Sequence, residues 1–410
     1  MKRFAILIIV TALLCGCLAL AANAKAVTTA ASRDGLKFRQ DGTFKIIQIS
    51  DLQETFFCST ITQEWLYDLA KKERPDLFVL TGDNISGGGA NWGTDFGSRF
   101  AVKHSIDAFM NVFDKIYRDF GTPVTMVFGN HDNEDTRVGR EGQFEMYAAH
   151  KSFIGWASDA DKGTKDIQGE HYGTHNLLIK DHTGATPVFN LWMFDSGSND
   201  ERGGYSWVQK PQIDWFNKTN AELNKLPSFA FQHIIVPEIY DFLTVTNEAD
   251  ANSFSRGFVD AQGKEYTKYI SRDLPAGVNG VLREAPCPAR YNDGQYNALN
   301  DAGNVLAMFF GHDHVNTFEL RMEGKTDLVN SPCAGFGSYG DIDLRGARVI
   351  TLKESNLKTY ETWHVPYQGF YGDGVLRETR LKMFQSMSTA GIIFDVVSFK
   401  PLLWIGGLFK

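Results

Sequence analysis

The sequence has few cysteines, no excess of positive charge and no visible internal repeat. A formal net charge of −8 gives it no basic footprint for nucleic acid or for acidic membranes. The lack of a repeat excludes solenoid architectures. What is present is an ordinary globular composition, because 43% of the 410 residues are hydrophobic, 13% are aromatic and 22% are charged. This composition supplies a sizeable core and excludes disordered and fibrous proteins.

The first 24 residues have the pattern of a signal peptide. Two basic residues precede an apolar run over residues 4–20, and small residues follow at 22–24. We therefore expect residues 1–24 to be removed and the protein to enter the secretory pathway, as a secreted, periplasmic or lumenal protein. The alternative is a lipoprotein, because residues 14–17 loosely resemble a lipoprotein box with the lipid on Cys17.

Cleavage at that site would leave three cysteines, which allow one disulfide bond at most. Cys287 and Cys333 each follow a proline and could pair, whereas Cys58 lies far from both in the sequence. Three separate thiols are the alternative. No CxxC motif or Cys/His cluster indicates structural zinc.

Apolar strand-like runs alternate with helical segments, which predicts an α/β fold of two sheets with helices outside. Thr60 to Arg74 reads as a helix, with a capping box formed by Thr60 and Gln63 and a stop at Pro75. Together with the strands on either side, it begins a βαβαβ unit. The other expected helices cover residues 100–120 and 211–223, and the expected strands cover residues 44–49, 77–80, 124–128, 188–194, 229–232, 305–310 and 348–352.

Two segments stand apart from this pattern. Residues 244–304 are rich in glycine, asparagine, aspartate and proline and predict a surface excursion that forms one wall of a cleft. The tail holds two apolar stretches, neither of which reaches the ~18 uninterrupted residues of a membrane span. We expect the tail to pack on the domain, and peripheral membrane contact is the alternative. The expected organisation is a signal peptide at 1–24, a linker at 25–43, a domain at 44–365 and a C-terminal extension at 366–410.

Polar residues that can bind metal ions follow several of the expected strands. Because the carboxyl ends of parallel strands meet at one edge of a sheet, these side chains can converge. Each residue alone is typical of a turn, but together they supply the carboxylate, amide and imidazole donors that a pair of divalent cations needs. The residues at these strand ends are Asp51, Gln53, Asp83, Asn130, His131, His233, His312, Asp313 and His314.

Taken in order, these motifs resemble the signature of calcineurin-like metallophosphoesterases. The matching runs are Asp51, Gly82-Asp83, Gly129-Asn130-His131-Asp132, His233 and Gly311-His312-Asp313-His314. Further matches, at Asp195-Ser196-Gly197, Tyr205, Trp207, Pro237-Glu238 and Tyr339-Gly340, are similar to an exported branch related to purple acid phosphatases. The resemblance covers residues 44–352. It implies a four-layer α/β/β/α sandwich of two mixed sheets, with two divalent metal ions (Mn, Fe or Zn) at the sheet edge.

The resemblance also implies a role for each residue. Asp83 would bridge the metals, with Asp51, His314 and residue 53 completing one site. Asn130, His233 and His312 would complete the other site. His131 would be the general acid and Asp132 its orienting partner. The implied reaction is hydrolysis of phosphate monoesters, or of diesters, by a hydroxide that bridges the two metals.

Two positions depart from the family pattern. Glutamine stands at position 53, where the family has histidine, and Ser86 stands where purple acid phosphatases have a metal-binding tyrosine. A glutamine offers only an amide oxygen, so we expect the first site to bind metal weakly and to favour Mn, Mg or Fe(II) over zinc. The alternative function is a non-catalytic or single-metal binding protein whose first metal site is degraded.

The substrate is not predicted beyond its class. Arg137 and Arg140 follow the His131 motif and are candidates to hold a substrate phosphate, although charged residues after a turn are usually solvated. The expected partners are a phosphorylated small molecule or a phosphoprotein. The apolar tail favours a substrate near a membrane.

Overall fold

The computed structural model describes residues 30–55, 59–86, 98–134, 136–155, 173–259 and 264–371. The predicted signal peptide, Cys58 and the apolar tail beyond residue 371 lie outside the described residues.

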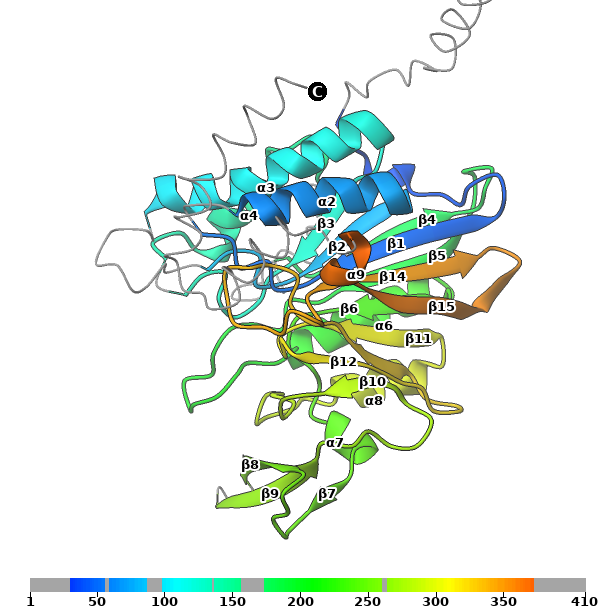
Figure 1. Cartoon of the computed structure of the whole chain (residues 1–410). Helices are drawn as coiled ribbons and strands as arrows, with labels where there is room; N and C mark the ends of the chain where they lie inside the picture. The colour runs from blue at the N-terminus through cyan, green and yellow to red at the C-terminus, as the bar shows by residue number, and fades with distance from the viewer. Residues whose placement is uncertain are drawn as a thin grey trace, which may run out of the picture.

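Two mixed β-sheets stack face to face in the middle of the molecule (Figure 1). The first sheet has the order β15(Asn356–Pro366), β14(Gly346–Lys353), β1(Thr43–Ile49), β2(Leu77–Thr81), β3(Val124–Val127). The second has the order β10(Asn279–Leu282), β12(Asn316–Leu320), β13(Asp327–Asn330), β11(Val305–Phe310), β6(Ser228–Phe231), β5(Pro187–Met193), β4(His175–Lys180). Both sheets combine parallel and antiparallel pairs.

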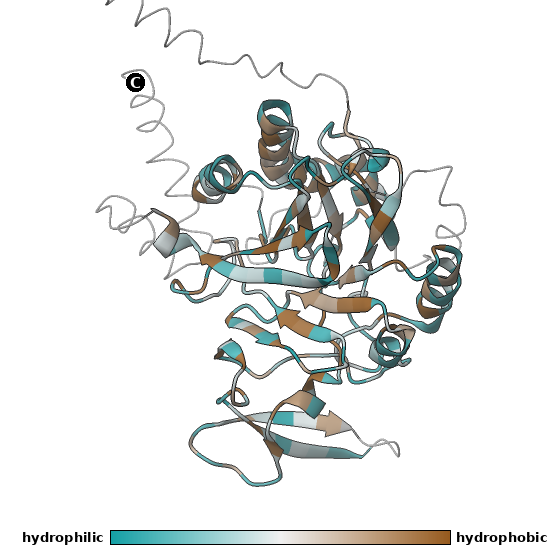
Figure 2. Cartoon of the chain, turned by 90° about the vertical axis from the view of Figure 1, so that its right-hand side faces the viewer, coloured by the Kyte–Doolittle hydropathy of each residue, from teal (hydrophilic) through white to brown (hydrophobic). Residues whose placement is uncertain are grey.

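Helices cover the outer faces of the two sheets. Those against the five-stranded sheet are α2(Thr60–Glu73), α3(Arg99–Phe120) and α4(Arg140–Ala148), and those against the seven-stranded sheet are α6(Lys210–Glu222) and α8(Gln295–Ala302). Three further short helices are η1(Arg33–Gly35), α7(Ile239–Phe242) and α9(Tyr367–Tyr371). The helices turn hydrophobic residues towards the sheets and polar residues outward (Figure 2). The predicted sandwich of two mixed sheets is therefore confirmed.

The core lies in three layers, and the central layer joins the two sheets. Phe229 of the seven-stranded sheet lies 5.0 Å from Tyr360 of the five-stranded sheet and 5.2 Å from Phe309, measured between ring centroids, and the rings of Phe229 and Phe309 are fully buried. Each buried phenylalanine stabilises the fold by about 1.5–3 kcal/mol through hydrophobic burial. This layer fixes the two sheets to each other, and thus the strand ends that carry the site.

The opening βαβαβ unit forms as predicted, with β1, β2 and β3 parallel. The predicted capping box at Thr60 is wrong by one residue. The N-cap of α2 is Ser59, whose side chain accepts a hydrogen bond from the Thr62 backbone N–H at 3.3 Å. Ser59 satisfies one of the unpaired N–H groups of the first turn.

The segment at 244–304 contains regular structure of its own. It forms a separate sheet of β7(Val245–Thr246), β9(Glu265–Ser271) and β8(Ser253–Val259) at the bottom of Figure 1, and then supplies β10 and α8 to the main body. Tyr240 in α7 packs on Phe258 at 4.9 Å between ring centroids, which attaches the small sheet to the chain that follows His233.

Cys287 and Cys333 are both free, so the pairing considered from the sequence is wrong. The Cys287 thiol lies 3.3 Å from the Ala285 carbonyl oxygen, and the Cys333 sulfur accepts a hydrogen bond from Arg345 at 3.1 Å. Within the described residues, no helix combines the length and hydropathy needed to cross a membrane.

Candidate metal centre

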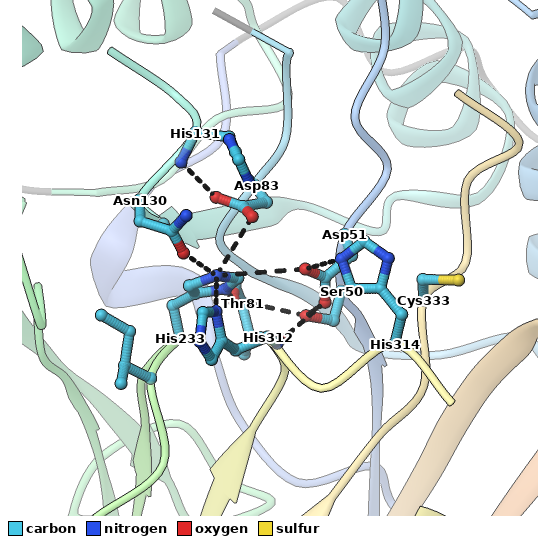
Figure 3. A network of polar contacts seen from close by, with 12 residues as sticks. Ser50, Asp51, Thr81, Asp83, Asn130, His131, His233, His312, His314 and Cys333 are labelled. Atoms are coloured by element: carbon cyan, nitrogen blue, oxygen red, sulfur yellow. Dashed lines mark hydrogen bonds and ion pairs between the residues drawn. The ribbon is translucent and has the colours of Figure 1, made fainter. Parts of the chain in front are cut away.

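Polar side chains from both sheets meet at one edge of the sandwich. Asp51 follows β1, Asp83 follows β2 and Asn130 follows β3, all from the five-stranded sheet. His233 follows β6 and His312 follows β11, both from the seven-stranded sheet. Figure 3 shows Asp83, Asn130 and His131 on one side of His233, and Asp51 and His314 on the other. The site therefore exists only where the two sheets are packed together.

His233 lies at the centre of this cluster. Its Nε2 is 3.2 Å from Asp83 Oδ2, 3.1 Å from Asn130 Oδ1 and 3.3 Å from His312 Nδ1. Asp51 Oδ1 lies 3.9 Å from the same Nε2. Asp51, Asp83 and His233 are buried and form a candidate metal-binding group, with ligand atoms within 4.8 Å of one another.

Backbone carbonyls fix the orientation of two of the imidazoles. His233 Nδ1 donates a hydrogen bond to the Thr81 carbonyl at 2.9 Å, and His314 Nδ1 donates to the Tyr339 carbonyl at 2.8 Å. A carbonyl can only accept, so both Nδ1 atoms carry hydrogen and both Nε2 atoms face the cluster. Metal-binding histidines are commonly held in this way by a hydrogen bond from their second nitrogen.

Two buried polar atoms of the cluster have no hydrogen-bond partner in the described residues. His312 Nε2 and Asp51 Oδ1 are buried and make no hydrogen bond, although His314 Nε2 lies 3.3 Å from Asp51 Oδ1. Each such atom costs about 1–3 kcal/mol of folding free energy. Carboxylate, amide and imidazole donors together suit Mn, Fe or Zn. The residues present therefore fit a divalent cation, with Asp51, Asp83 and His233 as the candidate group.

The charges of the cluster shift the pKa values of its members strongly. Burial alone would lower the pKa of His233, but the carboxylates of Asp83 and Asp51 raise it to about 9. Burial would raise the pKa of Asp83, but His233 and then His131 lower it well below its ordinary value. Burial and the neighbouring His233 lower the pKa of His312 to about 3. Without metal, the cluster thus holds a proton on His233.

We expect metal binding to compete with that proton. A raised histidine pKa stabilises the fold fully below the ordinary value of about 6.5, and this contribution is lost as the pH rises through about 9. Metal-free protein should therefore become less stable from pH 6.5 to pH 8.5, while metal affinity rises by up to about tenfold per pH unit. Thermal unfolding with chelator and manganese titrations across this range would measure both. A flat affinity profile would contradict this expectation.

The backbone at the site is held in an unusual conformation. Asp51, Gln53, Asp83 and His312 have positive φ angles of 54°, 42°, 50° and 71°, a region that residues other than glycine seldom adopt. Gly311 is required by close approach, because a Cβ there would lie 1.7 Å from Ser50 Oγ. These turns direct the side chains of the residues after each strand towards the same cluster.

His131 lies at the rim of the cluster, and its partner differs from the one expected. Its backbone N–H donates to Asp83 Oδ1 at 2.7 Å, and its side chain is 41% exposed. The predicted orienting partner, Asp132, makes other contacts: its carboxylate accepts the backbone N–H groups of Gly129, Asn84 and Ile85 at 2.6, 2.8 and 3.0 Å. Glu134 pairs with His131 Nδ1 instead. Asp132 ties the loops after β2 and β3 together.

Arg140, a candidate for substrate phosphate, is held by contacts within the protein. It is 7% exposed, pairs with the Asp195 carboxylate and donates to the Gly129 carbonyl at 2.8 Å. It therefore fixes the Asn130 loop against the loop after β5, and these contacts do not support the predicted phosphate-binding role. Arg137 is exposed and remains a candidate for phosphate binding.

Gln53 reaches the cluster, where its side-chain amide donates to Asp83 Oδ2 at 3.2 Å. We expect Gln53→His to raise metal affinity about tenfold, or about 1.4 kcal/mol, because an imidazole nitrogen is a stronger ligand for these ions than an amide oxygen. Metal content at limiting manganese would measure this, with Gln40→His at the surface as the control. Equal metal content in the wild-type and Gln53→His proteins would show that position 53 is not a ligand.

Two tyrosines pack on the His312-Asp313-His314 motif. Tyr205 meets His312 edge-on at 4.3 Å, and Tyr339 lies flat on His314 at 4.1 Å, both measured between ring centroids. The sequence marked both residues only as family matches, without a contact. Both tyrosines lie far from the histidines in the sequence, so no local sequence pattern indicates this packing.

The chain matches the model of the calcineurin-like phosphoesterase family over residues 44–316 and belongs to that family. Two relatives from Arabidopsis thaliana are named probable inactive purple acid phosphatase 14 and 28. The first is 26% identical over 81% of this chain and 80% of its own length, and the second is 28% identical over 80% and 79%. A dimetal phosphatase from Danio rerio is 13% identical with a TM-score of 0.45, covering 79% of this chain and 99% of its own.

Proposed function

We propose that the protein is a metal-dependent phosphoesterase that hydrolyses phosphate monoesters. The observation that carries this proposal is the buried cluster around His233, bordered by a half-exposed imidazole that a carboxylate orients. Asp51, Gln53, His314 and the shared Asp83 would hold one cation, and Asn130, His233 and His312 the other. Two divalent cations bound there would acidify a water molecule and neutralise charge on the phosphoryl oxygens.

His131 supports a protonation step in this proposal. Glu134 engages Nδ1 of the ring, so Nε2 lies on the opposite side, and in the imidazolium form it carries the hydrogen that can be donated. The Asp83 carboxylate fixes the His131 backbone N–H at 2.7 Å, and thus the position of the ring beside the cluster. A proton given from Nε2 to the leaving-group oxygen would release an alcohol instead of an alkoxide.

The second candidate is a binding protein without catalysis. It is favoured by Gln53, whose amide donates to Asp83 and so occupies the presumed bridging carboxylate. The names of the Arabidopsis relatives point the same way. The intact set of Asp83, Asn130, His233 and His312 supports the enzyme instead.

Hydrolysis of 4-nitrophenyl phosphate separates the candidates. Protein stripped by chelator and then loaded with manganese or Fe(II) should turn over the ester, and the stripped protein should not. Elemental analysis of the same samples gives the metal count. Two ions per chain with turnover support the phosphoesterase, one ion with turnover indicates a single-metal enzyme, and bound metal without turnover supports the binding protein.

We also propose that the protein is exported and acts on a phosphorylated small molecule or a phosphoprotein. The pattern of residues 1–24 supports export. Sequencing of the exported protein should begin at residue 25, whereas lipid attached to Cys17 would indicate a lipoprotein. Peripheral membrane contact through the tail remains part of this proposal, and sedimentation with lipid vesicles before and after deletion of residues 372–410 tests it.

A further inference from the structure

Tyr339 is anchored at the candidate metal centre on one side. Its ring lies flat on the His314 imidazole, with 4.1 Å between centroids and 12° between planes. Its hydroxyl donates a hydrogen bond to Glu284 Oε2 at 2.9 Å, and its backbone carbonyl accepts from His314 Nδ1. The position of the ring is therefore fixed in the absence of any ligand.

Tyr339 is nevertheless open to solvent. It is 58% exposed, whereas His314 beneath it is buried. Of the five large apolar side chains that are exposed in the described part of the chain, it is the one that stacks on a residue of the site. Because one face of the ring is covered by His314, the exposed surface is the opposite face and the edge.

The charged group in contact with Tyr339 is negative, and the nearby Arg345 is buried and donates to the backbone carbonyls of Gly335 and Ser338. Glu284 accepts the Tyr339 hydroxyl, and its other oxygen accepts the Val315 backbone N–H at 2.9 Å. Arg283 is paired with the Asp341 carboxylate. A leaving group that rests here therefore meets an aromatic face beside a carboxylate, which disfavours an additional anionic group.

We infer that the open face of Tyr339 is a leaving-group subsite for phosphate esters that carry an uncharged aromatic ring. This inference rests on the phosphoesterase function proposed above. A fixed aromatic ring prefers a planar aromatic ring over an aliphatic ring of the same size, because offset stacking adds to simple burial. The ring is also held by its hydroxyl, so little side-chain freedom is lost when a ligand stacks on it.

Benzyl phosphate and cyclohexylmethyl phosphate form a matched pair for the test. Both release a primary alcohol, and they differ in whether the six-membered ring is planar and aromatic or saturated. We expect kcat/KM of the metal-loaded protein to be about fivefold higher for the benzyl ester, or about 1 kcal/mol. Tyr339→Leu should remove this preference, and Tyr339→Phe, which keeps the ring, should retain it. Tyr266→Leu, which removes an exposed tyrosine from the small sheet, is the control.

The outcomes distinguish a leaving-group subsite at Tyr339 from a role in which Tyr339 only supports the His314 ring. If Tyr339 only supports the His314 imidazole, Tyr339→Leu lowers the metal content and lowers kcat/KM for the two esters by the same factor. An unchanged ratio of the two kcat/KM values therefore overturns the inference. Equal kcat/KM values for the two esters in the wild-type protein also overturn the inference.

Binding of benzylphosphonate and cyclohexylmethylphosphonate, measured by calorimetry, tests the subsite without turnover. Tighter binding of the benzyl compound that is lost in Tyr339→Leu supports it even if no ester is hydrolysed, in which case the proposed phosphoesterase function alone fails. Equal binding of the two compounds, or binding of neither, overturns the subsite.

Discussion

Asp83→Asn is expected to abolish phosphatase activity and most metal binding while leaving the fold intact. The carboxylate of Asp83 lies 3.2 Å from His233 Nε2 and also fixes the His131 backbone N–H. Asparagine has nearly the same shape, but it removes the charge on which both cations would depend. We expect kcat/KM to fall by on the order of 10³ or more, because the charge stabilisation from the metals is lost along with their ligand.

Asp76→Asn is the matched control for that variant. Asp76 lies at the opposite end of β2, where its half-buried carboxylate accepts the Lys45 backbone N–H at 2.7 Å and pairs with Arg39. It should lower stability without changing metal content or rate per bound metal. Equal activity of the Asp83→Asn and wild-type proteins would remove the basis of the proposed function.

His131→Ala is expected to lower kcat by about 10²–10⁴ for alkyl phosphates, which is the usual contribution of a general acid. For 4-nitrophenyl phosphate the loss should be much smaller, because nitrophenolate leaves without a proton. Metal content should stay unchanged, since the ring is not among the ligands. A loss of equal size for both esters would show that His131 does not protonate the leaving group.

Glu134→Gln should show the same pattern with a smaller loss, since Glu134 orients His131 without reaching the substrate. His182 and Glu354 form a similar exposed imidazole–carboxylate pair at 3.0 Å between β4 and β14–β15. His182→Ala is therefore the matched control and should leave activity unchanged. If Glu134→Gln matches the wild-type protein while Asp132→Asn stays folded and loses activity, the partner of His131 has been misassigned.

The ligand residues were visible in the sequence because each ends a short apolar strand. Asp51, Asp83 and Asn130 close three such strands, and the rule that parallel strands share a carboxyl edge places them together. The strands themselves were predictable because they are buried on both faces and read as continuous apolar runs.

The contacts between loops were not predictable in the same way. Asp132 and Glu134 both follow His131 closely, and only the turn geometry decides which carboxylate meets the ring. Arg140 is bound by Asp195, which lies 55 positions later in the chain. The small sheet was missed because residues 244–304 have the polar, glycine-containing composition of a loop, and its strands are mostly exposed.

Four of the proposed ligands follow strands of the five-stranded sheet, and three follow strands of the seven-stranded sheet. Cations bound there would link the two sheets at their edge, in addition to the aromatic layer that lies between them. Ligands that bind only the folded state add RT ln(1 + [L]/Kd) to its stability, which is about 4 kcal/mol at a thousandfold excess over Kd. The melting temperature of this protein would then rise with the free metal concentration of the compartment in which it is found, whether or not a substrate is present.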